Sequence, residues 1–265
     1  MISEENRGAA NKNLEETYFR LGLAAPESRL WDNEGFRACL GSYEHPICNF
    51  AIQLRLDPWS ARRLQTLASA RHAFHVYRLP GDQPEYLEEL LGRFDFFQVY
   101  SLDALIAEPE SASEELEPAE ANDDLARRSI SEFMAMQFFG RQGAQFRQQV
   151  QEATFSADDL TFHYVAERGR VVAAAMLSRT PGMLGVYNLC VSPNRRRRGL
   201  GSSFVRWSKS LAYREGRAVT LQCDPGLVEW YARFGFRAYG RIGVFSLLKP
   251  DGLAIMETGS VLQRA

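Results

Sequence analysis

The chain has 265 residues, a net charge of −2 and 45% apolar residues, an ordinary composition for a globular protein that is long enough for two domains. This charge argues against a general nucleic-acid-binding protein, which is usually basic. The N-terminal residues MISEENRGAANKN lack the apolar stretch of a signal peptide, and no apolar run approaches the roughly 20 residues of a membrane span. We therefore expect a cytoplasmic protein with neither a membrane nor a nucleic acid as partner.

Four cysteines are widely spaced, and none belongs to a C-x-x-C pair. Because each lies in or near an apolar run, we expect buried free thiols in a reducing compartment rather than disulfides or metal ligands. They are Cys39, Cys48, Cys190 and Cys223. We expect no metal site.

Residues 1–105 contain apolar runs that alternate between the two main periodicities. The pattern predicts strand, helix, strand, helix and strand in that order. The segments are HPICNFAIQLRL (45–56), WSARRLQTLASAR (59–71), FHVYRLPGD (74–82), PEYLEELLGRF (84–94) and DFFQVYSL (95–102).

Residues 106–124 read IAEPESASEELEPAEANDD, with eight acidic residues and no basic ones. Such a composition buries little surface and predicts a solvated linker. Without this segment the chain is mildly basic, which suits an anionic ligand. We expect domains at 1–105 and 125–265.

The second domain is predicted to be mixed α/β, with a parallel β-α-β unit whose crossover helix follows an arginine-rich loop. Residues 122–124 are candidates for the cap of its first helix. The expected elements are helices at 125–139 and 144–153, two strands in 161–180 around Gly169, a strand at 186–193, a helix from Leu200, a strand at 218–223, a helix at 228–234, and closing strands at 236–240 and 243–249.

The loop VSPNRRRRGLGSSF (191–204) lies between the predicted strand and the predicted helix. A helix N-terminus offers unpaired N–H groups and a partial positive charge, glycines allow a phosphate to approach the backbone, and arginines bind phosphate oxygens. The loop lacks the G-x-x-x-x-G-K-(S or T) pattern of a Walker loop and the full G-x-G-x-x-G of a dinucleotide site. A nuclear localisation signal is expected in an exposed tail, so we favour a pyrophosphate-binding loop.

Two motifs in order resemble the GNAT superfamily of acyl-CoA-dependent N-acyltransferases. Arg196 to Gly201 fits the loop pattern (Q or R)-x-x-G-x-(G or A), and 224–236, DPGLVEWYARFGF, is similar to the later motif of the family. Tyr231 and the Gly235-Phe236 pair match that motif in type and spacing. Asp224 stands where the family usually has Asn.

The resemblance, which covers roughly residues 122–250, implies acetyl-CoA as co-substrate and assigns residues to it. The strand at Leu189, Cys190 and Val191 would pair with the pantetheine arm, and the loop would hold the pyrophosphate. Tyr231 would protonate the departing thiolate, a role that suits a neutral phenol; the alternative is an aromatic residue that only packs. The expected cofactor-binding residues are Leu189, Cys190, Val191, Arg196, Arg197, Arg198, Gly199, Leu200, Gly201, Ser202, Asp224, Tyr231 and Phe234.

The general base is left open by the sequence. The acceptor amine must lose a proton before it attacks, and Glu167 and Glu229 are the nearest acids in sequence, although neither is compelling. A water relay is the alternative. Cys190 has no recognisable His or Asp partner, so we interpret it as a core thiol rather than a nucleophile.

The predicted order of elements in the first hundred residues repeats that of the second domain. ICNFAI resembles VYNLCV, and LPGD resembles QCDPG. We hypothesise a degenerate GNAT-like copy without a CoA loop, since LDPWSA stands where the glycine loop belongs and Asp57 would repel a phosphate; chance similarity of two α/β patterns is the alternative. Such a copy would cover a sheet edge or shape the acceptor pocket.

The sequence thus predicts tandem GNAT-like folds and an N-acetyltransferase that acts on a primary amine, in a small molecule or a peptide, by direct attack in a ternary complex. A non-catalytic acyl-CoA-binding sensor is the alternative. A nucleic-acid-binding module, which would bind with a steep salt dependence, is the least favoured reading.

Overall fold

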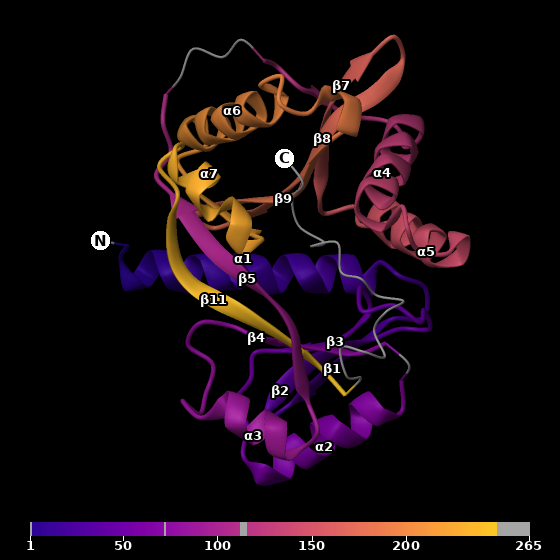
Figure 1. Ribbon diagram of the computed structural model, residues 1–265, viewed down its shortest axis with the longest axis vertical. Coiled ribbons are helices and arrows are strands. Elements are labelled where there is room, and N and C mark those ends of the chain that lie inside the picture. Colours follow the sequence, from indigo (N-terminus) through magenta and orange to yellow (C-terminus); the bar gives the residue numbers. More distant parts are fainter. Residues whose placement is uncertain (1, 72, 112–115, 248–265) are drawn as a thin grey trace.

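The computed structural model describes residues 2–71, 73–111 and 116–247, which form one mixed sheet with helices on both faces (Figure 1). The expected mixed α/β class is confirmed. The strands are β1 (Arg29–Asn33), β2 (Phe36–Leu40), β3 (Asn49–Ile52), β4 (His75–Arg78), β5 (Phe97–Ala107), β6 (Ala119–Glu120), β7 (Thr161–Glu167), β8 (Arg170–Thr180), β9 (Met183–Val191), β10 (Ala218–Cys223) and β11 (Arg237–Ser246). The α-helices are α1 (Glu4–Leu23), α2 (Pro58–Ser69), α3 (Leu87–Arg93), α4 (Asp124–Phe139), α5 (Ala144–Phe155), α6 (Leu200–Arg214) and α7 (Val228–Ala232).

The sheet has the strand order β1-β2-β3-β4-β11-β5-β10-β9-β8-β7-β6. The strands β1, β2, β3, β4 and β5 correspond to β7, β8, β9, β10 and β11. With this correspondence, the order of strands read from β1 towards β7 is the same as the order read from β7 towards β1. The last strand of each half pairs with a strand of the other half: β11 pairs with β4, and β5 pairs with β10, both antiparallel. In Figure 1, β5 and β11 run together through the middle of the molecule. The shared strand order is the outcome that the duplication hypothesis requires.

The two faces of the sheet are covered differently. On one face, α1, α4 and α5 pack over both halves and share a single apolar core, which includes Leu14, Met134, Tyr187 and Val244. On the other face, α2 and α3 cover the N-terminal strands, and α6 and α7 cover the C-terminal ones. The face beneath α1, α4 and α5 therefore joins the two halves.

Helix starts follow local capping chemistry. Asp123, within the expected capping residues, accepts a hydrogen bond from the Ala126 N–H, at 2.7 Å. Asp57 and Ser60 form a reciprocal capping box at the start of α2. The order strand, helix, strand, helix, strand that was expected in the first hundred residues is present as β3, α2, β4, α3 and β5.

The structure differs from the expectations at both ends of the predicted linker and at the closing strands. Residues 106–107 complete β5, and Ala119–Glu120 form β6, so the segment outside regular elements is shorter than 106–124.

The two closing strands are one strand, β11, with an irregularity between Ala238 and Gly240. Gly240 is not a turn: a Cβ there would collide with Pro80, so the glycine allows close packing. Residues 248–265, which include the end of the expected last strand, lie outside the described part of the chain.

The four cysteines are buried and free, as expected. Among the helices that the structure describes, none is both long and apolar enough to cross a membrane. The described residues also contain no cluster of three or more candidate metal ligands.

Candidate functional site

The site expected from the sequence is centred on a parallel pair of strands that separates. β9 and β10 are paired at Met183 with Ala218, Leu184 with Val219, and Gly185 with Thr220. Beyond these pairs β9 continues along β8, and β10 continues along β5. The ladder between β9 and β10 ends at Gly185 and Thr220, and from Tyr187 onward no described strand is paired with the side of β9 that faces β10. An extended ligand with amide groups can pair with that part of β9.

A bend in β9 lies where the strands part. Asn188 adopts a left-handed conformation with φ of 51°, and the ladder with β8 is shifted between Ala174 and Met176. Such a bulge re-aims the following side chains. Tyr187 and Cys190 belong to the core beneath α1, α4 and α5, whereas Leu189 belongs to the core beneath α6 and α7.

The strand residues expected to pair with the pantetheine arm are buried on this bent segment. Leu189, Cys190 and Val191 are each at most 1% exposed. Burial raises the pKa of the Cys190 thiol far above its usual range, which keeps it protonated and unreactive. Cys190 is therefore a core thiol, and only backbone groups of this segment are suited to binding a ligand.

The arginine loop divides into two parts. Arg195 forms an ion pair with Glu167 at 2.6 Å, and the Arg196 Nε donates to the Val191 carbonyl at 3.0 Å. These two side chains anchor the loop to β7 and β9. Arg197 and Arg198 are exposed, so the second part of the loop presents charge to solvent.

Helix α6 begins without a side-chain cap. Its N-cap, Gly199, has φ of 86°, a conformation that glycine adopts without strain, and no atom lies within 4 Å of where its Cβ would be. The first N–H groups of a helix have no partner within the helix. With Gly201 and Ser202 in the first turn, this terminus has the properties of an anion-binding site next to two exposed arginines.

Tyr231 lies on α7, on the α6 and α7 side of the sheet. It is 0% exposed, and its hydroxyl has no hydrogen-bond partner among the described residues. Its ring contacts Trp230 and Phe236 edge-on. Burial raises the pKa of this phenol well above its ordinary value of about 10. An orphaned buried hydroxyl is costly, so a ligand atom that accepts its hydrogen bond would be favoured here.

The remaining expected residues of the later motif take part in local contacts. The Asp224 carboxylate accepts a hydrogen bond from the Gly226 N–H at 2.8 Å, which closes its own turn. The Phe234 ring lies 5.1 Å from that of Trp230, and its carbonyl accepts from Lys209. Asp224 therefore stabilises the loop after β10, and Phe234 packs beside Tyr231.

Neither acid considered for the general base is placed for that role. Glu167 is paired with Arg195, and Glu229 is exposed on α7. The base that the sequence left open is not supplied by these two carboxylates.

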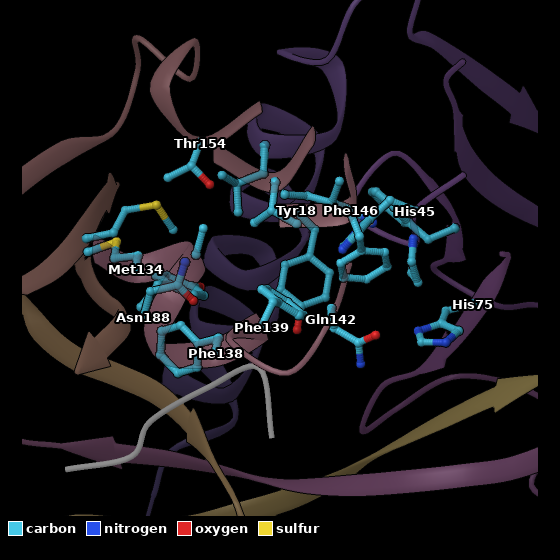
Figure 2. Close-up of a pocket in the computed structure, with 18 of the residues that line it drawn as sticks. Tyr18, His45, His75, Met134, Phe138, Phe139, Gln142, Phe146, Thr154 and Asn188 are labelled. Carbon is cyan, nitrogen blue, oxygen red and sulfur yellow. The ribbon is translucent and has the colours of Figure 1, made fainter. Parts of the chain in front are cut away.

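An apolar cavity whose lining residues were not anticipated from the sequence opens on the opposite face of β9. It lies among residues of both halves and is partly open to solvent. Figure 2 shows its walls, with Asn188, Met134 and Phe138 towards one end and His45 and His75 towards the other. The lining comes from separate segments, so no local motif marks the cavity. It is lined by Tyr18, Leu21, His45, Pro46, Ile47, Phe50, His75, Tyr77, Tyr100, Met134, Ala135, Phe138, Phe139, Gln142, Phe146, Val150, Thr154, Met176, Tyr187 and Asn188.

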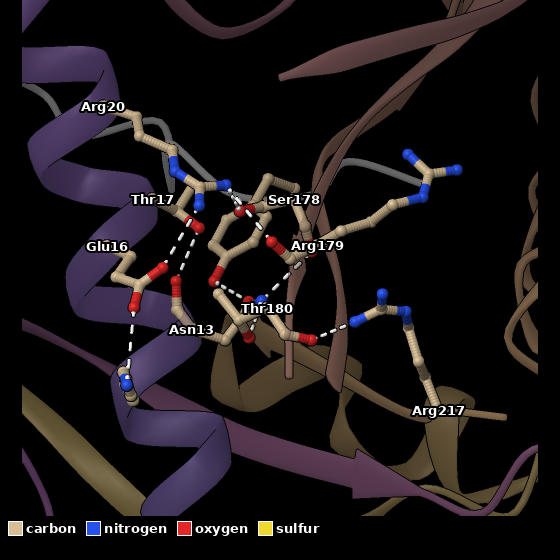
Figure 3. Close-up of polar contacts among 10 residues, drawn as sticks. Asn13, Glu16, Thr17, Arg20, Ser178, Arg179, Thr180 and Arg217 are labelled. Carbon is tan, nitrogen blue, oxygen red and sulfur yellow. Dashed lines mark hydrogen bonds and ion pairs between the residues drawn. The ribbon is translucent and has the colours of Figure 1, made fainter. Parts of the chain in front are cut away.

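Helix α1 is bonded to the strand that carries the bend. The buried Asn13 donates to the Ser178 carbonyl and to the Thr180 hydroxyl, each at 3.0 Å, and accepts from the Tyr187 hydroxyl at 2.8 Å. Arg20 adds contacts with the Ser178 hydroxyl and with Glu16 (Figure 3). The first helix of the chain thus positions β8 and β9 of the C-terminal half.

The N-terminal half has a similar divergence between β3 and β4. Their ladder contains the pairs Phe50 with His75 and Ala51 with Val76. Gln53 is left-handed with φ of 60° and follows the last paired residue, Ala51, by two positions, whereas Asn188 follows Gly185 by three. A left-handed residue therefore comes soon after the last paired residue in both halves.

In this half the chain itself pairs with the free edge. The Gln83 N–H donates to the Leu54 carbonyl at 2.9 Å, and its carbonyl accepts from the Leu56 N–H at 3.0 Å. The Asp82 carboxylate also accepts from the Leu54 N–H at 3.1 Å. Residues 82–83 thus occupy the backbone groups of Leu54 and Leu56, which follow β3.

The helix that follows also differs between the halves. Asp57 follows Gln53 by 4 positions, whereas Gly199 follows Asn188 by 11. The Asp57 carboxylate accepts from the Ser60 N–H at 2.7 Å and so caps α2. This N-terminus is occupied by the protein's own negative charge.

Fold and site together define a class of protein. It is a tandem α/β protein in which one pair of parallel strands separates and an uncapped helix flanked by arginines follows. Residues 159–238 match the sequence model of the acetyltransferase (GNAT) domain, so this part of the chain is a GNAT domain. No curated protein sequence matches the chain.

Solved structures share the fold over most of the chain. A GCN5-related N-acetyltransferase from Kribbella flavida has a TM-score of 0.64 at 16% identity, over 95% of this chain and 98% of that chain. A tandem GNAT protein from the clavulanic acid biosynthesis pathway has a TM-score of 0.57 at 11% identity, over 88% and 94%. A GNAT acetyltransferase from Colwellia psychrerythraea has a TM-score of 0.50 at 15% identity, over 89% and 96%. The tandem neighbour agrees with the two-part sheet described above.

Proposed function

We propose that the C-terminal half transfers an acetyl group from acetyl-CoA to a primary amine, by direct attack in a ternary complex. The observation that carries this proposal is the separation of β9 from β10, which leaves β9 without a described ladder partner on that side from Tyr187 onward, together with an uncapped helix N-terminus and a buried, unpartnered phenol. Acetyl-CoA supplies the activated acyl group as a thioester. The residues present fit its parts: an amide-bearing arm for the β9 edge, a pyrophosphate for α6, and a sulfur for Tyr231.

The start of α6 would bind the pyrophosphate. Its free N–H groups and the positive end of the helix dipole stabilise negative charge, and Arg197 and Arg198 add charge-assisted hydrogen bonds. We assign Gly199, Leu200, Gly201 and Ser202 to this contact through their backbone. Arg196 acts by holding the loop on the Val191 carbonyl, and Arg195 by pairing with Glu167.

Tyr231 would act on the leaving group. As the amine nitrogen bonds to the acyl carbon and the carbon–sulfur bond breaks, the electron pair stays on sulfur. The Tyr231 hydroxyl, fully protonated at neutral pH, donates its hydrogen bond and then its proton to that sulfur. The ammonium proton of the acceptor leaves through water, because Glu167 is paired with Arg195 and Glu229 is exposed on α7.

The test is calorimetric titration with acetyl-CoA together with thiol release in the presence of a panel of primary amines. We expect micromolar binding to the wild-type protein and to Tyr231→Phe. Turnover in Tyr231→Phe should fall about 10²-fold, the usual contribution of a general acid. Tyr213→Phe, which alters a 55% exposed tyrosine on α6, is the matched control and should be neutral. Absence of acetyl-CoA binding to folded wild-type protein would sink the proposal.

An acyl-CoA-binding sensor is the second candidate. It is favoured by one observation: the described lining of the cavity beside Asn188 contains no carboxylate that would act as a base. Acetyl-CoA binding without turnover on any amine, unchanged in Tyr231→Phe, would select the sensor. For either function, the four buried thiols support the expected cytoplasmic compartment.

A further inference from the structure

The apolar cavity is built jointly by the two halves. α1 contributes Tyr18, the N-terminal strands contribute Phe50 and Tyr77, α4 contributes Phe138 and β9 contributes Asn188. Asn188 is the bend at which β9 leaves β10, so one end of the cavity lies beside the proposed position of the acyl group. The other end lies among residues of the N-terminal half (Figure 2).

The described residues that line the cavity carry no charge at neutral pH. Lys, Arg, Asp and Glu are absent from this lining. Burial lowers the pKa of His45 to about 3 and that of His75 to about 4, so both imidazoles are neutral. Burial also raises the pKa of Tyr100 to about 12. A ligand with a carboxylate, a phosphate or several ammonium groups would lose its hydration here without a countercharge.

Two buried polar atoms at the far end have no partner. The His45 Nδ1 accepts from the Ile47 N–H at 2.8 Å, which places the ring proton on Nε2. That Nε2, and the Nδ1 of His75, have no hydrogen-bond partner among the described residues, although the two side chains are only 5% and 4% exposed. Unpaired polar atoms in an otherwise apolar cavity favour a ligand with a hydrogen-bonding group at that end.

Aromatic rings surround the space between these two ends. The rings of Phe139 and Phe146 lie 5.3 Å apart and both contact His45, and Tyr18 packs edge-on against Tyr77 at 4.9 Å. Such walls fit a flat ring better than a flexible chain.

We propose that this cavity binds the acceptor, and that the acceptor is a primary amine on a ring-containing, otherwise uncharged body with a hydrogen-bonding group remote from the amine. The inference rests on the proposed function for the identity of the reacting end. The amine would lie at Asn188 and the polar group at His45 and His75. The N-terminal half would then determine which amines are accepted.

The test uses tyramine and tyrosine, which differ by one carboxylate, with spermidine as a polycation. Calorimetry is run with and without saturating coenzyme A. We expect tyramine to bind at millimolar concentration or better, and at least tenfold more tightly than tyrosine or spermidine. Comparable binding of all three, or no binding of tyramine to folded protein, overturns the proposal.

Variants then assign the binding to the cavity. Ala135→Trp places a large side chain among the lining residues and should abolish tyramine binding, and Phe146→Ala should weaken it about fivefold. Phe133→Ala alters a partly buried phenylalanine of α4 that does not line the cavity, and it should have no effect. Tyramine binding that survives both lining variants places the site elsewhere.

Binding of acetyl-CoA separates the two proposals. Ala135→Trp should bind acetyl-CoA as the wild-type protein does, which also shows that it is folded. Loss of acetyl-CoA binding in the wild type contradicts the proposed function, whatever tyramine does. If Ala135→Trp weakens binding of octanoyl-CoA but not of tyramine, the cavity holds an acyl chain and the acceptor assignment is wrong.

Discussion

The β3-to-α2 and β9-to-α6 segments both lead from a parallel strand to a helix on the same side of the sheet, but they present different chemistry at the start of that helix. Each contains a left-handed residue, Gln53 just after β3 and Asn188 within β9. In the N-terminal segment a short connection ends at the Asp57 carboxylate, and residues 82–83 pair with the bent strand. In the C-terminal segment a longer, arginine-rich connection ends at Gly199, and from Tyr187 onward no described strand is paired with the side of β9 that faces β10.

This difference shows how one strand order can present different chemistry at corresponding places. The N-terminal half has a shorter loop, an acidic cap and a chain segment paired beside β3, while the sheet keeps the same order. We therefore propose that one acyl-CoA binds per chain, in the C-terminal half, and that the N-terminal half contributes to the acceptor cavity.

The largest effect is expected from Gly199→Glu, which changes the start of α6. The side chain would place negative charge at the start of α6 and force a left-handed conformation that costs about 1–2 kcal/mol. We expect acetyl-CoA affinity to fall more than about 100-fold by calorimetry, since both charge and cradle geometry are lost. Gly81→Glu is the matched control, because Gly81 is a left-handed glycine with open space in the N-terminal half. Equal effects of the two changes would contradict a single site.

Asn13→Leu tests whether the two halves unfold independently. It would leave the Tyr187 hydroxyl and the Ser178 carbonyl without these buried partners, which should lower the free energy of unfolding by about 1–3 kcal/mol. Denaturant unfolding should show one transition that shifts as a whole, because α1 joins both halves. Lys12→Ala, at the neighbouring exposed position, should change stability by less than about 0.5 kcal/mol. A shift confined to one of two transitions would show that the halves unfold separately.

The smallest effect expected is a pH dependence of the free energy of unfolding, to which both halves contribute. Burial lowers the pKa of His75 to about 4 in the N-terminal half and that of His163 to about 4 in the C-terminal half. The unfolded chain, with a histidine pKa of about 6.5, then binds more protons than the folded one. Each histidine therefore contributes stability that is complete above about pH 6.5 and is lost as the pH falls towards 4.

Unfolding measured at pH 7 and pH 5 should show this loss. His75→Gln and His163→Gln should each reduce the loss of unfolding free energy between pH 7 and pH 5 by about 1–2 kcal/mol relative to the wild-type protein. Comparing each variant with the wild type at the same pH cancels the contributions of other groups. An unchanged pH dependence in one variant would mean that its histidine is already solvated.

Much of the fold was predictable because its elements are locally encoded. The alternating strands and helices of both halves, the cap of α4 and the glycine loop follow from periodicity and turn chemistry. Helix α1 was missed because its buried face includes Asn13 and Thr17, so apolar periodicity is weak. The two predicted closing strands were wrong because Gly240 and Gly243 serve close packing rather than a turn.

The candidate site was predictable only where it is contiguous in sequence. The loop from Arg196 to Ser202 and the motif around Tyr231 are short segments with recognisable chemistry. The cavity is formed by side chains that are brought together from distant segments, and His45 and His75 lie in unremarkable local sequence.

The exchange of β5 and β11 has a consequence for biosynthesis. In the described chain, the edge of β4 away from β3 pairs with residues 243–245 of β11, so the N-terminal half of the sheet is completed only when that late segment has been synthesised. Until then β4 has an unprotected edge, which is a template for aggregation. We therefore expect the N-terminal strands to reach their final pairing only after the C-terminal half has been made.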